Sequence, residues 1–203
     1  MADLDEYREK RDFDASPEPP GGERDPGERP LFVVQDHDAS SRHWDFRIEA
    51  DGVLASWAVP KGPSTDPDEQ RLAIRTEDHP LEYADVEGHI PTDEYGGGEV
   101  VVWDLGPYRN LTETDDGEEK PVTTAIEQGH VEVWLEGEKL RGGWRLVHAR
   151  VGGDEDNWLL QKLDDEEADA RRRPTSTEPA SVLTGRTVGD IDEDDTIDTD
   201  ELS

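Results

Sequence analysis

Two histidines and an aspartate, His37, His43 and Asp45, are the residues of this chain best suited to chemistry, because imidazole and carboxylate groups bind divalent metals. Side chains alternate between the two faces of a strand, so His43, Asp45 and Arg47 should share a polar face opposite an apolar one. His37 can join them only if the chain reverses between them, and the Asp-Ala-Ser-Ser sequence of residues 38–41 favours such a turn. Composition alone does not separate a metal site from incidental surface polarity.

The spacing His43-x-Asp45 also begins the two-histidine, one-carboxylate triad of non-haem iron oxygenases. A later histidine would complete that triad, and the candidates are His79, His130 and His148. This alternative belongs to a different class of enzyme and stays open on the residues alone.

A third alternative is a non-catalytic module that binds nucleic-acid ends, with Arg47, Lys61 and Arg71 as phosphate contacts. The glycine run of residues 96–98 lacks the GxxxxGK[ST] pattern of a phosphate-binding loop, so it predicts a turn. Glu77 and His79 have the same parity as Arg71, which predicts a second polar face or an ordinary solvated edge strand.

A hairpin should position the central residues, because Asp51-Gly52 lies between two alternating runs and suits a type I′ turn. Where two large side chains pair across the hairpin they should fill a core, and where the partner on the second strand is small it should leave space beside the metal-binding candidates. The expected pairs are Trp44 with Val59, Asp45 with Ala58, Phe46 with Trp57, Arg47 with Ser56 and Ile48 with Ala55.

Many short strands with close turn signals and little helix predict a mainly β fold, a compact antiparallel barrel or sandwich. We expect an N-terminal arm (1–30) with a short helix at Leu4–Lys10, a β-domain (31–163) with an acidic loop at 111–120, and a flexible acidic tail (164–203). The expected strands are 31–37, 43–50, 53–60, 71–77, 99–104, 130–136, 143–151 and 157–163.

The net charge of -32, with 53 acidic residues against 21 basic ones, predicts a folded protein from a high-salt cytoplasm. The absence of cysteine excludes disulfides, thiolate metal sites and cysteine nucleophiles. No apolar run approaches the roughly 20 residues of a membrane span, and the start of the chain lacks a signal-peptide core, so we expect a cytoplasmic protein.

Several segments resemble the 3′-phosphoesterase domain of bacterial DNA ligase D and its stand-alone archaeal relatives. They are YREKRDFDASPEP, FVVQDHDASSRHWDFRIEADGVLASWAVPKGPS, RLAIRTEDHPLEYADVEGHIP, YGGGEVVVWD and the late LEGEKLRGGWRLVHAR and NWLLQKL, which together cover most of residues 7–163. The resemblance implies a compact β-barrel. No Lys-x-Asp-Gly nucleotidyl-transfer motif is present, so we expect a stand-alone end-healing enzyme and not a ligase.

The implied activity is manganese-dependent healing of DNA 3′ ends. Such enzymes remove a terminal ribonucleoside by phosphodiester cleavage and then the 3′-phosphate, leaving a 3′-OH. By resemblance His37, His43 and Asp45 are the ligands of Mn²⁺ or of another divalent transition metal such as Co²⁺. The other matched active-site residues are Arg47, Lys61, Arg71, Glu77, His79 and Tyr83, and, in the arm, Arg11, Asp12 and Glu18. The resemblance implies a monomer that acts on the 3′ ends of DNA or of RNA-containing primer-templates. We expect a separate ligase or polymerase as a further partner, and no membrane association.

Overall fold

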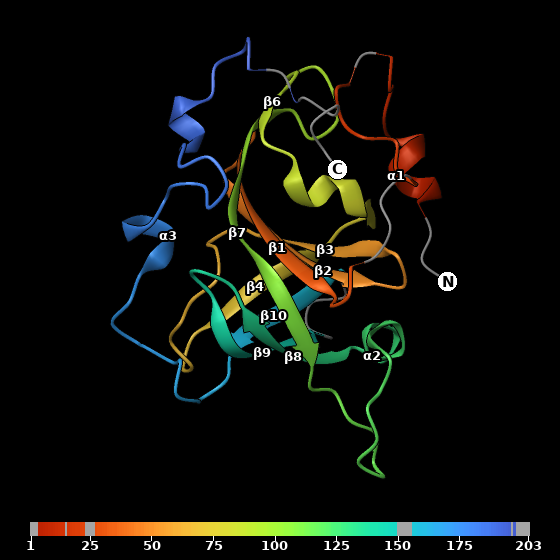
Figure 1. Cartoon of the computed structure of the whole chain (residues 1–203), viewed down its shortest axis with the longest axis vertical. Helices are drawn as coiled ribbons and strands as arrows, with labels where there is room; N and C mark the ends of the chain where they lie inside the picture. Colours follow the sequence, from red (N-terminus) through yellow and green to blue (C-terminus); the bar gives the residue numbers. More distant parts are fainter. Residues whose placement is uncertain (1–3, 15, 23–26, 150–155, 196, 198–203) are drawn as a thin grey trace.

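A computed structural model describes residues 4–14, 16–22, 27–149, 156–195 and 197 of the 203-residue chain, and within them the fold is mainly β, as predicted. Eight strands form a closed antiparallel barrel in the order β1-β2-β3-β4-β10-β9-β8-β7, which a β1–β7 pairing completes (Figure 1). The strands are β1 Leu31–Asp38, β2 His43–Ala50, β3 Val53–Val59, β4 Gln70–Arg75, β5 His79–Pro80, β6 Gly88–Ile90, β7 Gly98–Asn110, β8 His130–Glu136, β9 Arg141–His148 and β10 Asn157–Lys162.

Short helices lie around this barrel. They are the α-helices α1 Asp5–Glu9, α2 Val122–Gln128 and α3 Pro174–Thr177, and the 3-10 helices η1 Leu81–Asp85 and η2 Val188–Asp190. None of the described helices is long and apolar enough to cross a membrane.

The β2–β3 hairpin forms in the predicted register, including the pairs of Asp45 with Ala58 and Arg47 with Ser56. Asp51 and Gly52 both have positive φ, at 52° and 84°, as a type I′ turn requires. The chain also reverses between β1 and β2, which sets His37 directly opposite His43. The sequence therefore predicted the local geometry that brings the metal-binding candidates together.

Two apolar cores lie on opposite sides of the barrel wall. Trp44, Phe46 and Ile48 point into the barrel and pack with residues of the other strands. The outer face of β1 and β7 instead packs against η1 and the N-terminal arm, through residues such as Tyr7 and Tyr83. Figure 1 shows α1 and the yellow 3-10 helix on this same side of the barrel. The polar face of β2 therefore lies on the outer wall, under the arm.

Some elements differ from the sequence-based expectation. The strand predicted at 71–77 ends at Arg75, where the guanidinium lies over the Trp57 ring, while Glu77 and His79 follow in a separate segment. Arg71 therefore does not share one continuous strand face with Glu77 and His79. The strand predicted at 99–104 continues to Asn110 through Gly106 and Pro107. Of the strand predicted at 143–151, residues 150 and 151 lie outside the described part.

The C-terminal segment contacts the barrel at several points. Trp103 donates its indole N–H to the Glu178 carbonyl, and the Val182 N–H donates to the Val102 carbonyl. Val188 and Ile191 pack against Val101. These contacts do not test the predicted domain boundary at residue 164 or the predicted flexibility of the tail. Both stay predictions.

Candidate functional site

His37, His43 and Asp45 form a compact cluster on the outer face of β1 and β2. One ligand atom from each residue lies within 4.8 Å of the others. His37 Nδ1 and His43 Nε2 are each 3.5 Å from an Asp45 carboxylate oxygen. The cluster contains none of His79, His130 and His148, so the third group beside His43 and Asp45 is the earlier histidine.

The nitrogens of this cluster suit metal binding. His43 Nδ1 lies 2.9 Å from the Ser41 carbonyl, and a neutral ring that donates there keeps the lone pair on Nε2, toward Asp45. His37 Nε2 is buried and has no hydrogen-bond partner among the described residues. A buried, unsatisfied imidazole nitrogen beside a second imidazole and a carboxylate fits a divalent transition metal.

Arg47 fixes the carboxylate of this cluster. Its Nη2 donates to Asp45 Oδ2 at 3.0 Å, its Nε donates to Gln35 at 2.9 Å, and its Nη1 donates to Ser56 at 2.8 Å. Gln35 in turn donates to the carbonyls of Tyr83 and Val86. The guanidinium is buried and lies over the Tyr83 ring. Arg47 is therefore a fixed cation whose orientation depends on Gln35 and Ser56.

Arg47 beside Asp45 keeps this carboxylate ionised. Burial alone would raise the pKa of Asp45, but Arg47 and the neighbouring imidazoles of His37 and His43 outweigh burial and hold this pKa well below its usual range. The carboxylate is therefore ready to bind a cation at neutral pH.

His79, in the short strand β5, is also buried. Burial, with Arg47 and Arg11 nearby, lowers the pKa of His79 well below its ordinary value, so the ring is neutral at pH 7. His79 Nδ1 lies 2.9 Å from the Glu77 carbonyl, the position of a donor, and Nε2 lies 3.4 Å from Arg11 Nη2. The Nε2 lone pair of His79 therefore points toward Arg11 of the arm.

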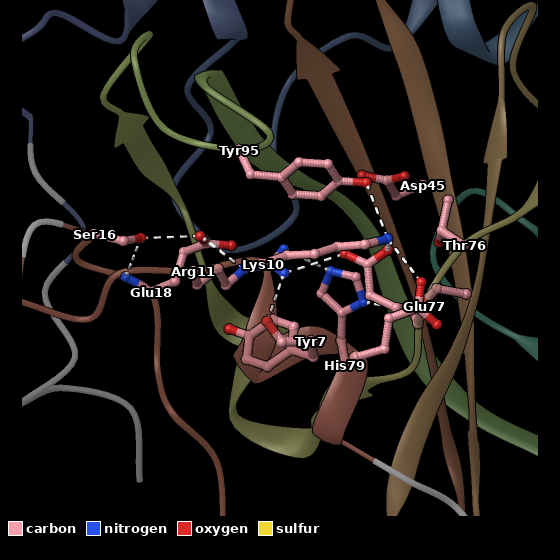
Figure 2. A network of polar contacts seen from close by, with 12 residues as sticks. Tyr7, Lys10, Arg11, Ser16, Glu18, Asp45, Thr76, Glu77, His79 and Tyr95 are labelled. Atoms are coloured by element: carbon pink, nitrogen blue, oxygen red, sulfur yellow. Dashed lines mark hydrogen bonds and ion pairs between the residues drawn. The ribbon is translucent and has the colours of Figure 1, made fainter.

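The N-terminal arm enters the site through Arg11, which is buried. Its Nε donates to Glu18 at 3.0 Å and its Nη1 donates to Glu77 at 3.1 Å (Figure 2). Lys10 donates to the second Glu77 oxygen at 3.1 Å. Burial alone would raise the pKa of Glu77, but the hydrogen bonds from its own backbone, Lys10 and Arg11 hold it below its usual value. An ionised Glu77 thus ties the arm to the barrel.

These groups line a cavity of about 270 Å³, which we call the reaction cavity. It brings together eight of the twelve site residues predicted from the sequence: Arg11, His37, His43, Asp45, Arg47, Glu77, His79 and Tyr83. Glu18 reaches it indirectly, because its carboxylate holds Arg11.

The other three predicted residues lie elsewhere. Asp12 is exposed and accepts a hydrogen bond from the Asp14 backbone. Lys61 is exposed in the turn after β3, and Arg71 pairs with Glu69 at 2.6 Å. None of the three lines the reaction cavity.

Sequence reasoning missed several residues that hold this site. Gln35 has the strand parity of His37, so alternation alone could have placed it on the polar face. Lys10 carried no local signal, because only the folded-back arm brings it near Glu77. Ser16 donates to Glu18, and the Tyr7 ring lies against the Arg11 guanidinium, both within four positions of their partners in the sequence. Tyr95 stood out only as the neighbour of a glycine run.

Comparison with known proteins gives a consistent result. The sequence pattern of the family described as "DNA Ligase D 3'-phosphoesterase domain" matches residues 35–148, more than half of the chain. The matched range contains the metal-binding cluster and Arg47, and the arm precedes it.

Curated relatives carry the same similarity beyond this range. The chain is 46% identical over 189 residues to "Multifunctional non-homologous end joining protein LigD" of Pseudomonas aeruginosa, covering 91% of this chain and 22% of the relative. It is 44% identical over 161 residues to "Multifunctional non-homologous end joining DNA repair protein LigD" of Mycobacterium tuberculosis, covering 79% and 20%. The chain thus spans about a fifth of the length of these relatives.

Proposed function

Because this chain belongs to the DNA ligase D 3′-phosphoesterase domain family, we propose that it is a metal-dependent hydrolase that heals DNA 3′ ends. It removes a 3′-terminal ribonucleoside as a phosphodiesterase and a 3′-phosphate as a phosphomonoesterase, and it leaves a 3′-OH for ligation. The names of these relatives refer to non-homologous end joining, and we extend that repair role to this chain.

One observation carries the proposal: two imidazoles, an ionised carboxylate and two fixed arginines line one small cavity. The chain has a net charge of -32, yet Arg11 and Arg47 are both buried at this point. Anchored guanidinium groups beside a set of metal ligands suit a phosphate group.

In this mechanism water attacks phosphorus in both reactions. Diester cleavage breaks the bond between phosphorus and the 5′-oxygen of the leaving nucleoside. Hydrolysis of the 3′-phosphate breaks the bond between phosphorus and the 3′-oxygen of the primer. Mn²⁺ bound by His37, His43 and Asp45 would polarise a phosphoryl oxygen. Arg47 and Arg11 offset the charge that develops on the phosphoryl oxygens. The neutral His79 accepts at Nε2, so it can protonate the leaving oxygen only after it has gained a proton. Lys61 and Arg71, which lie outside the reaction cavity, would contact the DNA strand there.

A 5′-labelled primer that ends in one ribonucleotide tests this function. We expect conversion first to the 3′-phosphate and then to the 3′-OH, with Mn²⁺ or Co²⁺ and not after EDTA treatment. A module that only binds ends would instead retain the label on the uncleaved primer during long incubation. Such an outcome would refute the hydrolase assignment.

The donor set also matches the iron-binding set of oxygenases, since it contains two imidazoles and one carboxylate. Turnover of Fe²⁺ and 2-oxoglutarate without DNA would identify that class. We favour the hydrolase because Arg11 and Arg47 surround the cluster and the family is a phosphoesterase family.

We also propose a cellular setting for this reaction. The protein acts as a monomer in a salt-rich archaeal cytoplasm, and a separate ligase or polymerase uses the healed ends. The three units are the arm (1–30), the barrel (31–163) and a flexible tail (164–203). The inward position of Arg11 and Glu18 supports the role of the arm in the active site.

A further inference from the structure

A second cavity of about 610 Å³ adjoins the reaction cavity, and we call it the tyrosine cavity. Thr76, Glu77 and Tyr95 line both, so a ligand can extend from one to the other. The volume of the tyrosine cavity is in the range of pockets that hold small organic ligands. The reaction cavity is less than half as large.

Tyr95 is the aromatic wall between the two cavities. About half of this residue is exposed, at 49%, and only Leu72 and Leu183 are comparably exposed among the large apolar residues that the structure describes. An exposed aromatic ring beside a phosphate site is a typical platform for a nucleobase.

The backbone holds Tyr95 in this position. A turn closed by the Gly97 N–H and the Glu94 carbonyl carries the tyrosine, and Gly96 within it has a φ of 77°. A side chain on Gly97 would meet the Pro91 carbonyl at 2.5 Å. Gly97 therefore allows the turn to pack closely against the backbone of Pro91 and Thr92.

Lys10 orients the side chain of Tyr95. Its ammonium lies 5.0 Å from the ring centroid and 3.5 Å from the hydroxyl, and it is fixed in turn by ion pairs to Glu6 and Glu77 (Figure 2). The tyrosine is thus held where the two cavities adjoin. Ile74 also lines the tyrosine cavity and supplies apolar surface there.

A third cavity of about 550 Å³ also adjoins the reaction cavity, through Ala39, Ser40 and Gly96. Three carboxylates line it, from Asp38, Glu94 and Glu99, and its lining contains no aromatic or basic residue. It offers a base no stacking surface. Of the two neighbouring cavities, the tyrosine cavity is the one with the chemistry of a nucleoside site.

We propose that the tyrosine cavity binds the 3′-terminal nucleoside of the substrate, with its base stacked on Tyr95 and its phosphodiester in the reaction cavity. This inference rests on the proposed function. The departing nucleoside carries no phosphate of its own after cleavage, so the four carboxylates in the lining, from Glu6, Glu77, Asp78 and Asp156, do not repel it. Tyr95 therefore contributes to substrate binding. When the substrate is a 3′-phosphate, which has no terminal nucleoside, the reaction cavity would remove it while the tyrosine cavity stays empty.

The test compares two primers that end in one ribonucleotide, one intact and one whose terminal ribose lacks the base. We expect Tyr95→Ala to reduce kcat/KM about 5- to 100-fold on the intact primer, the range that stacking of one base supports. On the abasic primer the same substitution should have little effect. Tyr95→Phe should keep the wild-type preference for the intact primer over the abasic one, because the aromatic ring remains. Leu183→Ala, at an equally exposed residue of the C-terminal segment, is the matched control.

An equal loss of kcat/KM on both primers, or no loss on either, would overturn the subsite. Binding of the same primers by EDTA-treated protein, followed by fluorescence anisotropy, separates this outcome from failure of the proposed function. If the wild type cleaves neither primer but binds the intact end more tightly in a Tyr95-dependent way, the subsite stands and the hydrolase assignment falls. If binding shows no such preference, the subsite falls as well.

Discussion

Arg47 donates to Asp45 through Nη2 at 3.0 Å, from a position two residues further along the same face of β2. One carboxylate oxygen is therefore held by a fixed cation, while both imidazoles lie 3.5 Å from the carboxylate. This arrangement keeps the carboxylate ionised and orients it before any metal binds. Strand alternation alone places the two partners side by side.

Replacement of a cluster residue should abolish metal binding. We expect Asp45→Asn to weaken Mn²⁺ binding more than 100-fold in isothermal titration calorimetry, since loss of an outer partner alone costs 10- to 100-fold. Both hydrolytic activities should disappear with it, as they should in His37→Ala and His43→Ala. Asp14→Asn is a suitable control because Asp14 is exposed in the arm and is not among the predicted site residues. Affinity of wild-type strength in Asp45→Asn would refute the metal assignment.

Loss of Gln35 should misorient Arg47. Gln35→Leu removes the acceptor of Arg47 Nε and the donor to two buried carbonyls, so we expect the free energy of unfolding to fall by about 1–3 kcal/mol. Mn²⁺ affinity should fall about tenfold as the Asp45 carboxylate loses its support. Gln161→Leu removes a glutamine that bonds Arg145 outside the cavity and should leave metal affinity unchanged. A Gln35→Leu protein with unaltered affinity would show that Arg47 needs no such support.

The Glu77 carboxylate should stabilise the fold in a pH-dependent way. Its folded pKa is lowered, so its contribution is present above the unfolded value of about 4.5 and is lost as the pH falls through the folded pKa. We expect Glu77→Gln to cost about 1–3 kcal/mol at pH 7, less than a fully buried pair because Lys10 is 32% exposed. The difference from wild type in urea unfolding should shrink between pH 5 and pH 3. Exposed Glu118→Gln provides the baseline, and a constant difference would contradict the prediction.

Salt should increase activity. At about 1 M KCl the Debye length falls to about 3 Å, so repulsion between DNA and a surface of net charge -32 is screened. Contacts inside the reaction cavity are closer and lose less. We expect the cleavage rate to rise from 50 mM to about 1 M KCl, opposite to the usual loss of DNA affinity with salt. A steep fall over 50–500 mM, with an unchanged circular dichroism spectrum, would reject the halophilic interpretation.

The sequence predicted the barrel and its central hairpin well because their signals are local. Alternation in residues 43–50 and the Asp51-Gly52 turn set the register without reference to the rest of the chain. It missed α2, whose seven residues include Val122, two threonines and Ile126, because such side chains favour strands. Gly129, in a left-handed conformation at the end of α2, was the available signal of a helix.

The composition of the site was less predictable where distant segments meet. Lys10 and Glu77 are 67 positions apart, and no periodic pattern relates them. Arg71 and Glu77 share parity in the sequence, but β4 ends at Arg75 between them and only Glu77 reaches the reaction cavity. Parity predicts a shared face only while the strand continues.

The closure of the barrel has a consequence for the order of folding. β1 pairs with β2 across a short turn but with β7 across more than sixty residues. β4 pairs with the nearby β3, but its other neighbour is β10, near the end of the barrel sequence. Pairings at long sequence separation form slowly, while hairpins form in microseconds. His37, His43 and Asp45 all lie on the β1–β2 hairpin. On a ribosome, the candidate metal ligands can therefore meet before most of the barrel has been synthesised, and a metal ion bound at that stage would favour the correct hairpin.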